Sequence, residues 1–199
     1  MLEVKDATIR VGGKTLMSGL SFIAQDGQMT CITGPSGTGK TALIRTLMGF
    51  LPVGEGFVTV DDELLTVHSA GAFRQMMVYL PQKMHTLRHQ LYEPVFSCGD
   101  APEYGVWDMQ LTDIEAENPA DVLSPEEIFS LAEKTIVEGM EKPIVIADEP
   151  AAMLTLELSQ KMLQLLTKQA RAGKTVLIAS RRPEMIACAD KVIEVKSEE

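Results

Sequence analysis

The sequence predicts an α/β fold, in which a parallel or mixed β-sheet is covered by helices on both faces and preceded by an antiparallel β subdomain. Three observations support this prediction. Residues 2–24 alternate apolar and polar side chains around a Gly12-Gly13 turn, as a β-hairpin does. A glycine-rich loop at 34–41 separates an apolar, strand-like run from a helical pattern. In the second half, buried strand-like runs alternate with helical patterns, which is typical of a parallel sheet.

The glycine-rich loop has the pattern G-x-x-x-x-G-K-[ST], and its residues are Gly34-Pro35-Ser36-Gly37-Thr38-Gly39-Lys40-Thr41. A loop of this kind turns backbone amides toward a nucleotide's phosphates, and the helix that follows adds a partial positive charge at its N-terminus. We expect Lys40 to reach the β- and γ-phosphates and the Thr41 hydroxyl to hold Mg²⁺. The loop therefore predicts a P-loop nucleoside triphosphatase (NTPase) core.

In the first half, apolar alternation and turn residues set the expected elements. We expect strands at 2–10, 15–24, 29–33, 57–60 and 76–80, and helices at 42–48 and 70–75. A segment rich in glycine, 49–56, should end the loop's helix. Gln82 follows the last of these strands.

The second half begins with an irregular stretch, 83–122, in which no period is sustained. Ser124, Pro125 and Glu127 then form a helix start, with Ser as N-cap, Pro in the first turn and Glu completing a capping box. This helix should run to Glu138. The elements expected after it are strands at 143–148, 175–179 and 191–195, a helix at 156–172, and a helix from the end of the 175–179 strand to about 189.

Length and composition indicate one domain, because 199 residues with 45% hydrophobic content can bury a single core. The net charge of -10 argues against a nucleic-acid partner, since binding phosphates along a duplex requires clustered Lys and Arg. Cys31, Cys98 and Cys188 are widely spaced and are expected to be buried, reduced thiols of an intracellular protein. No apolar run is long enough to cross a membrane, so a partner would have to supply any membrane spans.

Two acids, Asp148 and Glu149, directly follow an apolar strand. In a phosphate-loop ATPase this is the position of an acid that holds Mg²⁺ and of a second acid that activates the attacking water. We therefore predict Asp148 as a metal-site residue and Glu149 as the catalytic base.

Three motifs together resemble the nucleotide-binding subunit of an ABC (ATP-binding cassette) transporter. They are the phosphate loop, the run Tyr79-Leu80-Pro81-Gln82, and the run Ile146-Ala147-Asp148-Glu149-Pro150. The resemblance covers nearly the whole chain. It implies that Gln82 ligates Mg²⁺, senses the γ-phosphate and relays its state to a membrane partner.

The chain departs from this family at its signature, Leu-Ser-Gly-Gly-Gln, which aligns with Leu123-Ser124-Pro125-Glu126-Glu127. In the family, the glycine amides of the signature hold the γ-phosphate of ATP bound to the opposite subunit. Pro125 has no amide hydrogen, and Glu126 and Glu127 would bring negative charge toward a phosphate. We expect this stretch to keep its role as a helix start and to lose its role as a ligand.

Three further departures concern single positions. Arg181 stands where the family has its switch histidine; it can contact a phosphate but cannot exchange a proton near neutral pH. The loop 151–155 lacks the family's closing Asp. The adenine-stacking aromatic should lie near Arg10 or Val11, and neither is aromatic. Either Arg10 stacks on the base, or the position is a plain strand residue.

The resemblance implies a single nucleotide-binding domain, residues 1–199, with a reduced helical subdomain at 83–139. It implies a subunit that binds ATP with Mg²⁺, hydrolyses ATP and energises a membrane transport complex. Its partners would be a membrane-spanning subunit and a second, identical or different, ATPase subunit, and its location the cytoplasmic face of the membrane. The alternatives are an assembly module with little turnover and, against the charge, a DNA-repair or chromosome ATPase.

Overall fold

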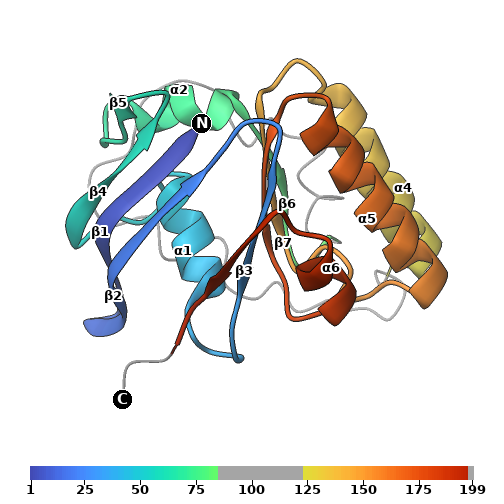
Figure 1. Cartoon of the computed structure of the whole chain (residues 1–199), viewed down its shortest axis with the longest axis horizontal. Coiled ribbons are helices and arrows are strands. Elements are labelled where there is room, and N and C mark those ends of the chain that lie inside the picture. Colours follow the sequence, from blue (N-terminus) through green and yellow to red (C-terminus); the bar gives the residue numbers. More distant parts are fainter. Residues whose placement is uncertain (85–122, 197–199) are drawn as a thin grey trace.

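The computed structural model describes residues 1–84 and 123–196. Of the irregular stretch at 83–122, which we expect to be a partly helical surface insertion, residues 85–122 lie outside the described residues, and Cys98 lies among them. In the described part, two β-sheets and the helices between and beside them form a layered α/β arrangement (Figure 1). The predicted fold class is confirmed.

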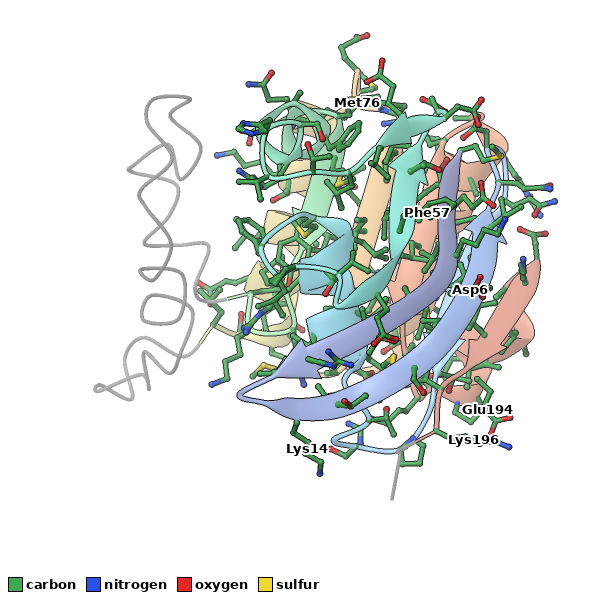
Figure 2. The ribbon with its side chains drawn as sticks, turned by 90° about the vertical axis from the view of Figure 1, so that its left-hand side faces the viewer. Asp6, Lys14, Phe57, Met76, Glu194 and Lys196 are labelled. Atoms are coloured by element: carbon green, nitrogen blue, oxygen red, sulfur yellow. The ribbon has the colours of Figure 1, made fainter. Side chains whose placement is uncertain are left out.

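The first sheet is antiparallel and has the order β2-β1-β4-β5. Its strands are β1 (Leu2–Val11), β2 (Lys14–Ala24), β4 (Glu55–Val60) and β5 (Glu63–Leu64). Glycines at 12 and 13, both with positive φ, form the turn of the predicted hairpin. In Figure 2 this sheet faces the viewer, with Asp6 and Phe57 labelled on it. The short strand β5 was not predicted, because two exposed residues carry no periodic signal.

The second sheet is parallel throughout and has the order β6-β7-β8-β3-β9. Its strands are β3 (Met29–Thr33), β6 (Met77–Leu80), β7 (Ile144–Asp148), β8 (Thr175–Ala179) and β9 (Lys191–Glu194). All residues of β7 and β8 are buried, as expected for central strands covered on both faces. The carboxyl ends of β3, β6, β7 and β8 therefore meet along one edge, where ligands bind in parallel sheets.

Helices cover the two faces of the parallel sheet unequally. One apolar core lies between this sheet, the antiparallel sheet and α1 (Lys40–Leu47), which runs between the two sheets in Figure 1. The other core lies against the opposite face, beneath α4 (Pro125–Glu138), α5 (Leu156–Arg171) and α6 (Pro183–Ala187). A short helix, α2 (Ala70–Gln75), precedes β6. No helix in residues 1–84 and 123–196 is long and apolar enough to cross a membrane.

Two expectations are corrected by the structure. The last helix ends at Ala187 instead of near residue 189. Cys188, the C-cap of that helix, is exposed, whereas Cys31 in β3 is buried as expected; both are free thiols. The prediction that Cys188 is buried was wrong. It was based on the apolar neighbours of Cys188, but the end of this short helix faces solvent.

Candidate nucleotide site

The phosphate loop connects β3 to α1 and depends on glycine where the backbone approaches other groups. A Cβ on Gly34 would lie 2.2 Å from the Val195 carbonyl oxygen, so no larger residue fits without moving the chain. Gly39 is the N-cap of α1 with φ of 90°, in the left-handed region that glycine adopts at low cost. These positions let the loop turn tightly before the helix begins.

The N-terminus of α1 is left open. No side chain caps it, and its first turn carries no acid. Lys40 is 7% exposed, and its Nζ donates to the carbonyl oxygens of Gly34 and Pro35, each at 2.8 Å. Burial lowers the pKa of Lys40, while the Glu149 carboxylate opposes that shift. Lys40 thus holds the loop in shape with its charge inside the site, as required for phosphate binding.

Asp148 and Thr41 face each other across the loop. The Thr41 hydroxyl donates to Asp148 Oδ2 at 2.6 Å, joining residues 107 positions apart. Asp148 is 1% exposed, and burial raises the pKa of its carboxyl, against the lowering effect of the Thr41 hydrogen bond. Its second oxygen, Oδ1, is buried and has no hydrogen-bond partner in the part of the chain that the structure describes.

These oxygens fit Mg²⁺. An unpartnered carboxylate oxygen, the Thr41 hydroxyl and the Gln82 side chain line one pocket, and hard oxygen ligands are those that Mg²⁺ prefers. Within residues 1–84 and 123–196, no group of three or more His, Cys, Asp or Glu could hold a metal by itself. A site with one carboxylate suits Mg²⁺ that completes its shell with water and substrate phosphates.

Glu149 lies at the turn after β7 with φ of 45°, an uncommon value for a residue other than glycine. Its backbone N–H donates to the Ala179 carbonyl at 2.8 Å, which ties it to the end of β8. Arg181, two residues beyond β8, donates from Nε to Glu149 Oε1 at 2.9 Å. The Arg181 backbone N–H reaches Glu149 Oε2 at 3.4 Å. The predicted base and the residue at the switch position therefore form an ion pair.

One pocket of about 230 Å³ collects almost all predicted site residues; its lining is Ser36, Gly37, Gly39, Lys40, Thr41, Gln82, Asp148, Glu149 and Arg181. The remaining predicted residues build the loop itself. Gly34 and Pro35 supply the carbonyl groups that Lys40 binds, and the buried Thr38 hydroxyl donates to the Pro35 oxygen at 3.0 Å. Loop, strand ends and Gln82 thus converge on one cavity large enough for a phosphate chain.

The stretch at the signature position is a helix start, as predicted. Ser124 caps α4, accepting from the Glu127 N–H at 3.2 Å, while Glu127 Oε2 accepts from the Ser124 N–H at 2.8 Å. The capping box is complete, with Pro125 in the first turn.

The residues at the other two positions where the chain departs from the family, the loop 151–155 and Arg10, also make contacts within the fold. Thr155, at the end of the loop that lacks the closing Asp, caps α5 by accepting from the Leu158 N–H at 3.3 Å. Arg10 donates to Glu55 on β4 at 3.0 Å, which engages the side chain that could otherwise stack on a base.

The Arg181–Glu149 pair was not predicted from the sequence, because the two residues are 32 positions apart. In the sequence, each of the two residues follows a buried strand. This predicts a contact only when β7 and β8 are known to be neighbours, with Asp148 opposite Ala179.

The fold and the pocket define a phosphate-loop nucleotide-binding protein. The sequence model of the ABC transporter family matches residues 17–152, more than half of the chain. The chain belongs to this family, which confirms the resemblance predicted from its motifs. The predicted function class, an ATP-binding ATPase of the kind that serves transporters, is confirmed with it.

Curated relatives include ATP-binding proteins of import and export systems. A hemin import ATP-binding protein of Streptomyces coelicolor is 27% identical over 203 residues, covering 95% of this chain and 72% of that protein. A hemin import ATP-binding protein of Chelativorans is 37% identical over 82 residues, covering 41% of this chain and 31% of that protein. A cytochrome c biogenesis ATP-binding export protein of Nitrobacter winogradskyi is 26% identical, covering 90% of each chain.

Solved structures confirm the fold. A dimeric ATP-binding cassette in a post-hydrolysis state, bound to ADP and Pi, aligns with a TM-score of 0.73 at 18% identity, covering 98% of this chain and 94% of that one. Protein cbiO1 of Clostridium perfringens, part of an ABC transporter complex, aligns with a TM-score of 0.71 at 21% identity, covering 98% and 84%.

Proposed function

We propose that this protein binds ATP with Mg²⁺ in the pocket at the end of β3, β6 and β7, hydrolyses it, and thereby energises a membrane transport complex. The observation that carries the proposal is the unpartnered, buried Asp148 oxygen beside the Thr41 hydroxyl, in a pocket that also holds Lys40 and Glu149. A buried carboxylate oxygen without a partner is costly, and a bound cation would compensate that cost.

The residues have separable tasks in this proposal. The loop amides, the open N-terminus of α1 and Lys40 bind and orient the phosphates. Thr41, Asp148 and Gln82 hold Mg²⁺, which supplies positive charge that neutralises the phosphate oxygens. Glu149 accepts a proton from the attacking water, and Arg181 contacts a phosphate.

Calorimetry with Mg-ATP tests the binding step. Lys40→Ala is expected to weaken binding about 30-fold or more, because a buried, hydrogen-bonded charge is lost. Lys168→Ala, at an exposed position of α5, is the matched control and should bind as the wild type does. Equal affinity of Lys40→Ala and wild type would contradict the proposal.

Phosphate release tests the hydrolysis step. We expect the isolated chain to work more slowly than the roughly 1 to 10³ s⁻¹ common for enzymes, because its signature is altered. Glu149→Gln should remove most of the activity, whereas Glu157→Gln, on the exposed face of α5, should not. Fast turnover by the isolated chain would overturn the argument from the signature.

For the partners, we propose a membrane-spanning subunit, with this chain at the cytoplasmic face, and a different ATPase subunit opposite this one. The capping box of α4 supports an asymmetric pair, because Pro125 has no amide hydrogen and the Glu127 amide is bonded to Ser124. Mass measurement of the Glu149→Gln protein with ATP, alone and with candidate partners, tests the pairing. A stable ATP-dependent homodimer, together with wild-type turnover that gains nothing from any partner, would exclude it.

A further inference from the structure

The two residues of the Arg181–Glu149 ion pair differ in their exposure to solvent. Glu149 is 8% exposed, and each of its carboxylate oxygens accepts a hydrogen bond from Arg181. The Arg181 side chain, in contrast, is 52% exposed. The acid is therefore covered by an arginine that itself remains partly in solvent.

Both ends of this pair are fixed to the sheet. Glu149 directly follows β7 and is bonded to the Ala179 carbonyl, while the Ser180 N–H donates to Ile32 on β3 at 3.0 Å. Since Ser180 is buried, the backbone of Arg181 cannot drift away from Glu149. The Arg181 side chain, which is 52% exposed, has room to change partner.

The same pocket that holds this pair also holds the phosphate loop and Lys40. A phosphate group that enters it carries more negative charge than the Glu149 carboxylate and presents oxygens that match a guanidinium fork. It competes with Glu149 for Arg181. Where the Arg181 side chain moves to the phosphate, Glu149 Oε1 loses its partner and becomes open to water, while the Arg181 backbone N–H stays beside Oε2.

We propose that Arg181 is a latch that covers Glu149 in the nucleotide-free protein and is released by the phosphates of ATP. This inference rests on the proposed function, because the phosphate is that of the bound substrate. The latch restrains the base until substrate is present, and breaking the ion pair is part of the cost of binding ATP.

A double-mutant cycle on ATP affinity tests the latch. Glu149→Gln removes the competitor for Arg181, so it should tighten Mg-ATP binding about three- to tenfold in the wild-type background. In an Arg181→Ala background there is no latch to release, and the same substitution should leave the affinity unchanged. Calorimetry on the four purified proteins gives the cycle, and circular dichroism checks that each is folded.

Two variants make the test specific. Arg171→Ala removes an exposed arginine at the end of α5, so Glu149→Gln should still tighten binding in that background. Arg181→Lys keeps the charge and should restore part of the coupling to Glu149, including when Arg181→Ala folds poorly. In steady-state kinetics, Arg181→Ala should raise KM for ATP, because the contact between Arg181 and the phosphate is lost.

Other outcomes reject the latch. An equal gain in affinity from Glu149→Gln in both backgrounds would show simple charge repulsion between the carboxylate and ATP. No gain in either background would equally overturn it. Failure of the wild type to bind Mg-ATP would instead reject the proposed function itself.

Discussion

Two helix N-termini of this protein, those of α1 and α4, are built in opposite ways. The N-terminus of α1 has glycine as its cap, no side-chain cap bond and no acid in its first turn. The N-terminus of α4 has Ser124 and Glu127 in a complete capping box, with Pro125 and Glu126 in the first turn. The first leaves its amides available to an anion, whereas the second has no amide hydrogen at Pro125, bonds the Glu127 amide to its own cap and repels negative charge.

The difference shows how stability and binding are divided between two parts of this protein. The capping box and acids of α4 stabilise their helix by interactions that are all local. The α1 region instead keeps an unpartnered Asp148 oxygen and a buried Lys40, which destabilise the protein until a ligand compensates them. A site that binds phosphate and Mg²⁺ therefore contains a buried charge and one unsatisfied polar atom, which a structural helix end does not.

Placing an acid at the open N-terminus of α1 is expected to have the largest effect, a loss of Mg-ATP affinity. Gly39→Asp would place a carboxylate at the phosphate site, and Mg-ATP affinity should fall on the order of a hundredfold relative to Gly39→Ala. The comparison uses Gly39→Ala because both variants suffer the same strain, from φ of 90° and from a Cβ 3.0 Å from the Leu16 side chain. Calorimetry measures both, and equal affinities would mean that the α1 terminus does not face the phosphates.

Removing the proline and the acids from the capped N-terminus of α4 is expected to have a smaller effect. The triple change Pro125→Gly, Glu126→Gly and Glu127→Gln should lower the free energy of unfolding by about 2 kcal/mol, since glycine is a poor helix former and the first-turn acids are lost. With a partner subunit present, phosphate release should rise several-fold. The result is checked by urea unfolding and a phosphate assay.

Ser124→Ala is the control for that triple variant. It removes the cap without changing charge, so it should cost about 1 kcal/mol of unfolding free energy and leave turnover unchanged. A triple variant that is destabilised but no faster than Ser124→Ala would show that α4 does not face a nucleotide.

The smallest expected effect is on the free energy of unfolding, which the unpartnered Asp148 carboxylate lowers while the nucleotide site is empty. Because burial raises the pKa of Asp148 in the folded protein, the nucleotide-free protein loses stability as pH rises through that raised pKa. Asp148→Asn does not titrate, so it should be more stable than the wild type near neutral pH, by about 1 kcal/mol, with the difference shrinking in acid. Thermal or urea unfolding across pH, without nucleotide, measures this.

Saturating Mg-ATP provides the control for the Asp148 variant. The added ligand should stabilise the wild type more than Asp148→Asn, because the variant lacks the carboxylate that would hold Mg²⁺. If Asp148→Asn were less stable than the wild type at every pH without nucleotide, the unpartnered carboxylate would not destabilise the folded protein.

The sequence alone was sufficient wherever the interactions are local. The phosphate loop and the capping box of α4 were predicted because their donors and acceptors lie within a few residues of one another. The strand boundaries were predicted to within two residues in most cases. The bounds of 83–139 as a reduced helical subdomain remain a prediction, since of that segment only 83–84 and the part from 123 onward, with α4, are described.

Only the tertiary structure decided how the site residues are brought together. The order β6-β7-β8-β3 sets Gln82 and Asp148 at the ends of neighbouring strands and brings Thr41 to Asp148. The same order puts Arg181 on Glu149, a contact that no spacing in the sequence reveals. The physical reason is that the order of strands in a parallel sheet follows from how the whole core packs, whereas a loop or a cap is determined by the residues within it.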